Sequence, residues 1–193
     1  MCQLGAGFKN LLGIDAFIDK DITYDNNLKI IKSDFSQFDA LTFDWIMFHH
    51  SFEHLNNPVG TFKKLSSLLN PNGNVLIRIP IIDSYAWEYY KTNWIQLDPP
   101  RHFFIHSINS IKELANMFNF KIRRVLYDST AFQFLGSEQW KRRIPLMSPE
   151  SYFQNPNNSI FNKEDVIKYS EKVKELNINQ KGDTACFFLQ KED

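Results

Sequence analysis

The stretch from Phe43 to Pro80, FDWIMFHHSFEHLNNPVGTFKKLSSLLNPNGNVLIRIP, decides the fold of this chain. It contains two apolar runs, at 45–48 and 75–79, of the kind found in strands that are covered on both faces. Between them, Asn57 is placed to cap a helix that begins at Pro58, and apolar side chains recur on one face of that helix. A Pro-Asn-Gly turn precedes the second run. The stretch therefore predicts a βαβ unit with parallel strands and a right-handed crossover.

Similar patterns extend outward on both sides of this unit. Apolar runs predict further strands near 11–15, 28–31, 122–127 and 184–189, and helical periodicity begins near 108 and again near 166. The residues from 136 to about 162 are polar and interrupted by proline, which indicates an insertion. We expect a single domain over residues 1–193, with an inserted, lid-like segment at about 136–180.

The composition is that of a globular protein. The 193 residues carry no net charge, 43% are apolar and 23% are charged, which argues against wholesale disorder. Without a basic excess, neither nucleic acid nor a membrane surface is expected as a partner. The two cysteines lie far apart and form no disulfide or metal framework, and no apolar run reaches transmembrane length. We expect a cytoplasmic protein.

Two predicted strands end near a carboxylate, at Asp15 and Asp34, and the segment from Trp94 to His102 is rich in polar and proline residues. Together with the stretch from Phe43 to Pro80, they resemble class I S-adenosylmethionine-dependent methyltransferases, within the small-molecule subgroup. The resemblance implies an α/β, Rossmann-like, doubly wound and mostly parallel sheet with an antiparallel last strand. It also implies methyl transfer from S-adenosylmethionine to a small-molecule acceptor.

The resemblance assigns the cofactor to residues that follow the strands. Asp15 would accept hydrogen bonds from the ribose hydroxyls, because a carboxylate can accept from two neighbouring donors. Asp34 would hold the adenine amino group, with Phe35 beside the ring. Phe17 suits a position in the protein core better than one beside the adenine ring, although both positions are left open. His49 would line the cofactor by its position.

The acceptor pocket is assigned by the same resemblance to His54, Arg101 and His102. Arg101 suits an acidic acceptor. His102 suits proton removal, because imidazole titrates near neutral pH. A purely structural role for His102, among its aromatic neighbours, is an equal alternative.

One part of the family pattern has no counterpart in this sequence. Family members begin with a strand and a glycine-rich loop, whereas only ten residues precede Leu11, and the glycines at 5 and 7 have no strand before them. We therefore expect a missing first βα unit and weak cofactor binding. The alternative is a non-catalytic remnant that binds a partner, or that pairs an exposed sheet edge in a homodimer.

A third hypothesis comes from the spacing of His50, Glu53 and His54, which resembles the motif of zinc hydrolases. Two histidines four residues apart bind zinc together when both lie on one helix. Here His50 directly follows a predicted strand. A helix that ran through the motif would also be interrupted just after it, by the proline at 58. We expect no metal ligands here, nor from His102 and His106.

Overall fold

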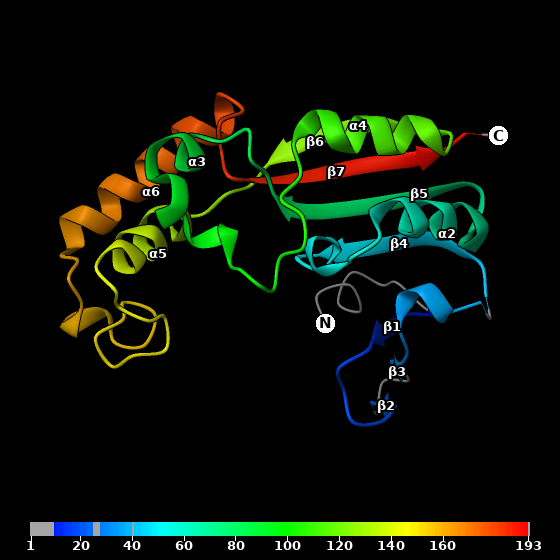
Figure 1. Cartoon of the computed structure of the whole chain (residues 1–193), viewed down its shortest axis with the longest axis horizontal. Coiled ribbons are helices and arrows are strands. Elements are labelled where there is room, and N and C mark those ends of the chain that lie inside the picture. The colour runs from blue at the N-terminus through cyan, green and yellow to red at the C-terminus, as the bar shows by residue number, and fades with distance from the viewer. Residues whose placement is uncertain (1–9, 25–27, 40, 193) are drawn as a thin grey trace. The chain divides into compact units, whose positions relative to one another are not determined.

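The computed structural model describes residues 10–24, 28–39 and 41–192. The chain forms two compact units, Met1–Thr42 and Phe43–Asp193 (Figure 1). The glycines at 5 and 7 lie outside the described residues, and so does the segment on which the expectation of a missing first βα unit depends.

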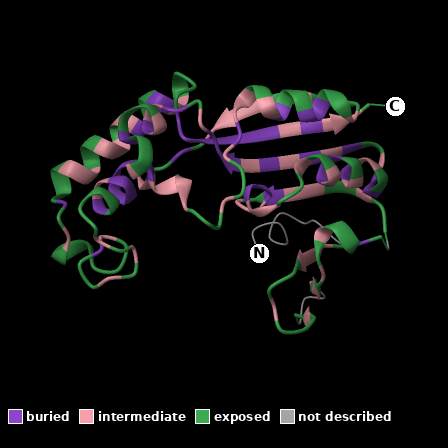
Figure 2. Cartoon of the chain, in the orientation of Figure 1, coloured by how far each residue is buried: buried purple, intermediate pink, exposed green. Residues whose placement is uncertain are grey.

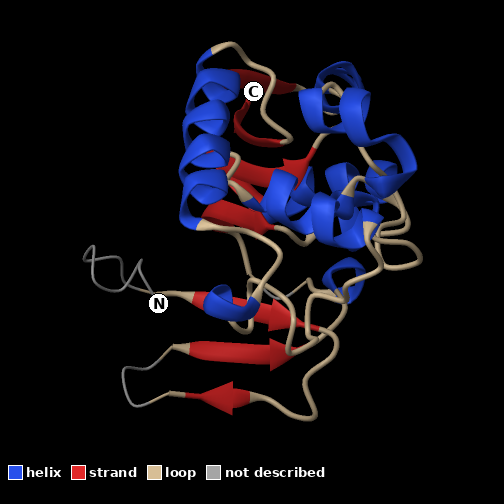
Figure 3. Cartoon of the chain, turned by 90° about the vertical axis from the view of Figure 1, so that its left-hand side faces the viewer, coloured by secondary structure: helices blue, strands red, loops and turns tan. Residues whose placement is uncertain are grey.

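The first unit contains a small three-stranded sheet in the order β1-β3-β2. β1 and β3 are parallel, with Leu12 opposite Lys29, and β2 pairs antiparallel with β3 (Figure 3). The apolar runs near 11–15 and 28–31 thus form strands as predicted, whereas the two-residue β2 was not predicted. The elements of this unit are β1 Leu12–Asp15, β2 Ile22–Thr23, β3 Lys29–Lys32 and the 3-10 helix η1 Phe35–Gln37.

The second unit is built on a four-stranded sheet in the order β4-β5-β7-β6. β4 and β5 are parallel, as the βαβ prediction requires, and β7 runs antiparallel to both β5 and β6. The expected α/β class and the antiparallel last strand are therefore confirmed. The strands are β4 Phe43–His49, β5 Leu69–Pro80, β6 Phe120–Tyr127 and β7 Thr184–Lys191.

Helices α2 Pro58–Leu68 and α4 Ile108–Met117 lie along this sheet (Figure 1). Asn57 caps α2 as predicted, since its Oδ1 accepts a hydrogen bond of 2.8 Å from the Gly60 amide. The apolar face of α2 is fully buried at Phe62 and Leu65, and the Phe62 ring packs edge to face against Phe52 and Phe120. Burial of this face, rather than intrinsic propensity, holds a helix of this length in place.

The remaining helices form a separate cluster beyond one end of the sheet (Figure 1). They have a core of their own around Trp94 and Phe134. The cluster consists of α3 Tyr85–Tyr90, α5 Phe132–Lys141, α6 Lys163–Ile178 and the 3-10 helices η3 Lys91–Asn93 and η4 Ile95–Leu97. Two further 3-10 helices of this unit are η2 Phe52–His54 and η5 Pro156–Asn158. No helix among the described residues is long and apolar enough to cross a bilayer.

The sequence did not predict α3 or α5. The segment predicted as an insertion from residue 136 begins within a helix, because Gly136 lies inside α5. A Cβ at Gly136 would lie 3.0 Å from Ile95 Cγ1, so this glycine allows close packing rather than breaking the helix. A lid function for residues 136–180 stays a prediction.

Candidate active site

A cleft of about 480 Å³ opens in the second unit, near the ends of β4 and β5 where the helical cluster meets the sheet. Ligands of open α/β sheets bind outside the carboxyl ends of the strands, so this is where a site is expected. The cleft is lined by His50, Glu53, His54, Arg78, Gln96, Asp98, Arg101, His102, Thr130, Phe132, Gln133, Asp183 and Thr184.

Two loops meet at this cleft and are joined by their backbones. The Phe103 amide donates to the Glu53 carbonyl oxygen over 2.9 Å. One imidazole nitrogen of His54, Nδ1, lies 2.9 Å from the Arg101 carbonyl oxygen. The rings of His54 and His102 then lie edge to face, with centroids 4.8 Å apart. The structure thus brings together the three residues predicted to line the acceptor pocket.

The loop that carries Arg101 and His102 is ordered by Asp98, whose backbone has the left-handed φ of 38°. The Asp98 carbonyl oxygen accepts from the Arg101 and His102 amides. Its carboxylate Oδ2 lies 2.5 Å from Arg101 Nη2. His102 is nearly buried, and its Nδ1 lies 2.7 Å from the Gln96 carbonyl oxygen. His102 is therefore fixed, whereas the Arg101 side chain is paired but 69% exposed and can reach a ligand.

A line of polar contacts runs from Asp128 through Arg78 and His50 to Glu53, and sequence reasoning missed two of these residues, Arg78 and Asp128. Arg78 Nε donates to Asp128 Oδ2 over 2.6 Å, and Arg78 Nη1 contacts His50 Nε2. His50 Nδ1 lies 3.4 Å from Glu53 Oε1. A signal was present in the sequence, because Arg78 is the one charged residue within an otherwise apolar strand run.

The zinc-hydrolase arrangement of His50 and His54 is not formed. His50 has a left-handed φ of 48°, and only the three residues of η2 are helical, so the two histidines do not lie one turn apart on a helix. Arginine is always a donor, so the Nε2 atom of His50 that faces Arg78 accepts its hydrogen bond. His50 is therefore already engaged by the protein itself.

His49, predicted to line the cofactor, ends β4 with an exposed side chain. Partial desolvation, and then the positive charge of Arg78, lower the pKa of His49. Its imidazole is therefore neutral at neutral pH.

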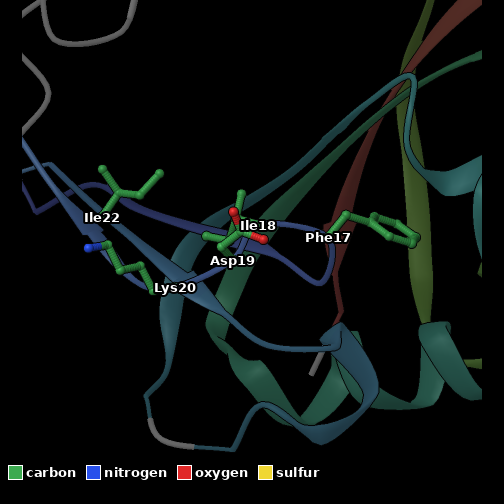
Figure 4. Close-up of a pocket in the computed structure, with 5 residues that line it drawn as sticks. All are labelled: Phe17, Ile18, Asp19, Lys20 and Ile22. Carbon is green, nitrogen blue, oxygen red and sulfur yellow. The ribbon is translucent and has the colours of Figure 1, made fainter.

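The first unit holds the other predicted cofactor residues. Asp15 ends β1, and its Oδ1 accepts from the Phe17 amide over 2.8 Å. Phe17 is 94% exposed, so its expected place in a core is wrong. It lines a hollow of about 370 Å³ with residues 18–20 and Ile22 (Figure 4).

Asp34 begins η1 and is followed by the half-buried Phe35. Its carboxylate accepts from both the hydroxyl and the amide of Ser36, and these bonds lower the pKa of Asp34. Asp34 is therefore charged at neutral pH. Asp34 therefore already caps η1, and a contact with adenine would have to be compatible with this capping role.

Comparison with known proteins identifies the family. The profile of the family described as "Methyltransferase domain" matches residues 3–125 of the chain. The chain belongs to this methyltransferase family. The resemblance to class I S-adenosylmethionine-dependent methyltransferases, drawn from the sequence, is confirmed.

Solved structures share the fold of this methyltransferase domain at low sequence identity. A protein described as a sarcosine dimethylglycine methyltransferase, from Galdieria sulphuraria, is 17% identical, with a TM-score of 0.51 over 88% of this chain and 61% of its own. The mycolic acid cyclopropane synthase CmaA1, solved with S-adenosylhomocysteine, is 17% identical, with a TM-score of 0.54 over 94% and 70%.

A methyltransferase from Archaeoglobus fulgidus is 14% identical, with a TM-score of 0.51 over 93% of this chain and 75% of its own. The chain thus spans between three fifths and three quarters of the length of these neighbours. No curated protein matches it by sequence.

Proposed function

We propose that this protein transfers a methyl group from S-adenosylmethionine to a small-molecule acceptor. The match of residues 3–125 to the methyltransferase family carries the proposal. The complex of CmaA1 with S-adenosylhomocysteine supports the choice of cofactor.

The reaction is an in-line displacement at the sulfonium methyl. The acceptor's lone pair forms a bond to the methyl carbon, the carbon–sulfur bond breaks, and S-adenosylhomocysteine leaves with that electron pair. The main contribution of the protein is alignment of the acceptor, the methyl group and sulfur, and removal of the acceptor's proton adds to it.

Three residues of the cleft are proposed to handle the acceptor. Arg101, which is largely exposed, would bind an acidic group of the acceptor. His54 would form a wall of the pocket. A carbonyl oxygen only accepts, so Nδ1 of His102 must donate to Gln96, and the Nε2 atom of its neutral form carries the lone pair that can take a proton.

The cofactor roles of Asp15, Phe17, Asp34, Phe35 and His49 are proposed from the family resemblance. Asp15 is the sharpest to test, because one carboxylate oxygen already holds the Phe17 amide. Its second oxygen would accept from the ribose. A charged acceptor of this kind contributes about 1.5–3 kcal/mol to binding, which corresponds to roughly 10- to 100-fold in affinity.

Calorimetric titration with S-adenosylhomocysteine tests the proposal. We expect saturable binding of one ligand per chain, and Asp15→Asn weakens it at least about tenfold. The matched control is Asp21→Asn. It removes the same charge in the same unit and, like Asp15→Asn, leaves an oxygen for the amide that the native side chain binds, here that of Lys32. No binding at millimolar ligand, or equal losses in both variants, would contradict the proposal.

A homodimer is proposed as the assembly, formed through an edge of the larger sheet. β4 and β6 are the outer strands of that sheet, and outer strands pair readily with other chains. Sedimentation equilibrium would give twice the chain mass if this is right, and a single chain mass if it is wrong.

A further inference from the structure

Glu53 is the buried group in the cleft that the proposed methyl transfer does not explain. Its side chain is 1% exposed, yet it lines the cleft. His50 Nδ1 lies 3.4 Å from Oε1, but neither carboxylate oxygen has a hydrogen-bond partner among the described residues. Burial of an unpaired carboxylate is strongly unfavourable unless a proton or a cation accompanies it.

Two imidazoles lie close to this carboxylate, and Nε2 of one of them, His102, is also 3.9 Å from Asp98 Oδ2. One ligand atom from each of Glu53, His54 and His102 lies within 4.8 Å of the other two. Both histidines use Nδ1 for a backbone carbonyl oxygen, at 2.9 Å for His54 and 2.7 Å for His102. A carbonyl oxygen cannot donate, so Nδ1 carries the hydrogen and Nε2 of each neutral ring holds a lone pair. Metal-binding histidines are oriented in this same way in proteins.

The neighbouring charged groups are already engaged with each other. His50 accepts from Arg78, which also donates to Asp128, and Asp98 pairs with Arg101. Neither Arg78 nor Arg101 is hydrogen-bonded to the Glu53 carboxylate. Among the described residues, the Glu53 carboxylate therefore has only the long contact from His50 Nδ1, 3.4 Å from Oε1, and it can still accept a ligand of the cleft.

We propose that Glu53, His54 and His102 bind a divalent transition-metal cation of the zinc class. Two imidazoles and one carboxylate form the donor set of zinc sites that keep a position open. Imidazole donors favour such cations over Mg²⁺, which prefers oxygen ligands. Ligands at zinc lie about 3.4 Å apart at tetrahedral angles, so closure of the site requires shifts of roughly 1 Å.

This site differs from the one that the spacing of His50 and His54 indicates, and it revises the sequence expectation that no metal is bound. It draws His102 from a loop 48 residues after His54. A bound cation takes the Nε2 lone pair of His102, so cation binding and proton removal by His102 exclude each other.

Calorimetric titration of the full-length, tag-free and metal-free protein with Zn²⁺ tests the proposal, with Co²⁺ as a spectroscopic probe. We expect one Zn²⁺ per chain and a visible Co²⁺ absorption band that Zn²⁺ removes and millimolar Mg²⁺ does not. Glu53→Gln and His102→Gln weaken Zn²⁺ binding at least about 100-fold, since even indirect partners of such sites are worth 10- to 100-fold.

Matched controls distinguish this site from other surface donors. Glu88→Gln and Glu113→Gln alter exposed residues of the same type as Glu53 and leave Zn²⁺ affinity within about twofold. Circular dichroism and S-adenosylhomocysteine titration of each variant show that it is folded. Absence of Zn²⁺ binding at millimolar concentration overturns the proposal, and so does equal affinity in all variants. Neither result affects cofactor binding, which tests the proposed function separately.

Discussion

The two units of the chain contain similar apolar strands but bury them very differently. In the first unit, Phe38 is the only residue buried among those described, and the strands β1 and β3 are half-exposed (Figure 2). In the second unit, Val75, Ile77 and Phe187 are fully buried under helices. The difference teaches that an apolar run predicts a strand, whereas burial depends on helices that return to cover it.

The test with the largest expected effect replaces one phenylalanine by alanine in each unit. Phe62→Ala empties a fully buried site against Phe52 and Phe120, and we expect a loss of about 3–5 kcal/mol in the free energy of unfolding. Phe17→Ala, at a side chain that is 94% exposed, changes it by less than about 0.5 kcal/mol. Urea denaturation measures both. Similar losses would show that the first unit depends on Phe17 for a core.

Buried charge provides a second test, since Asp183 lies wholly inside the second unit. Its Oδ2 accepts from Trp94 Nε1 over 3.0 Å, and burial raises the pKa of Asp183 to about 6 from 3.8. The folded protein therefore holds a proton that the unfolded chain releases between these pH values. The associated stability is fully present below about pH 3.8 and is lost as the pH rises through 6.

The Asp183→Asn variant removes this ionisation and keeps an acceptor for Trp94. Two pKa units correspond to about 3 kcal/mol, so wild-type stability falls by that much more than the variant's between pH 4 and pH 7. Thermal and urea unfolding across this pH range measure the difference. Parallel pH profiles for the two proteins would refute the assignment.

The smallest expected effect is at Asp34, the counterpart of Asp183 in the first unit. Its bonds from Ser36 lower the pKa of Asp34, so its contribution is present above about pH 3.8 and is lost as the pH falls through the lowered pKa. Because the group is exposed, Asp34→Asn costs less than about 1 kcal/mol at pH 7, and the cost falls as the pH drops through the lowered pKa. An effect as large as that at Asp183 would mean that the first unit also buries its carboxylates.

Local chemistry predicted much of the fold. Asn57 and Pro58 marked the start of α2 because a cap and a first-turn proline act through neighbouring residues alone. The start of α3 has a similar local signal, since the Ser84 hydroxyl accepts from the Trp87 amide, although α3 itself was not predicted. α5 was missed because the packing of Gly136 against Ile95 depends on a contact distant in sequence.

For the candidate site, the sequence could predict some of the residues but not their burial or their contacts. Family resemblance pointed to His54, Arg101 and His102, but no local pattern shows that Glu53 is buried or that Arg78 reaches His50. Both facts depend on how separate strands and loops pack together. The sequence therefore pointed to three of the residues that line the cleft, whereas only the packed structure shows which of their atoms are occupied.

The hydrogen bond from the Phe103 amide to the Glu53 carbonyl oxygen has a consequence for folding order. It links residues that are fifty positions apart in the chain, across β5 and α3. A contact that closes so long a loop is entropically unfavourable until the intervening elements are in place. We therefore expect this contact to form after the pairing of β4 with β5, which closes a shorter loop, as between Trp45 and Asn74, and to open before that pairing does.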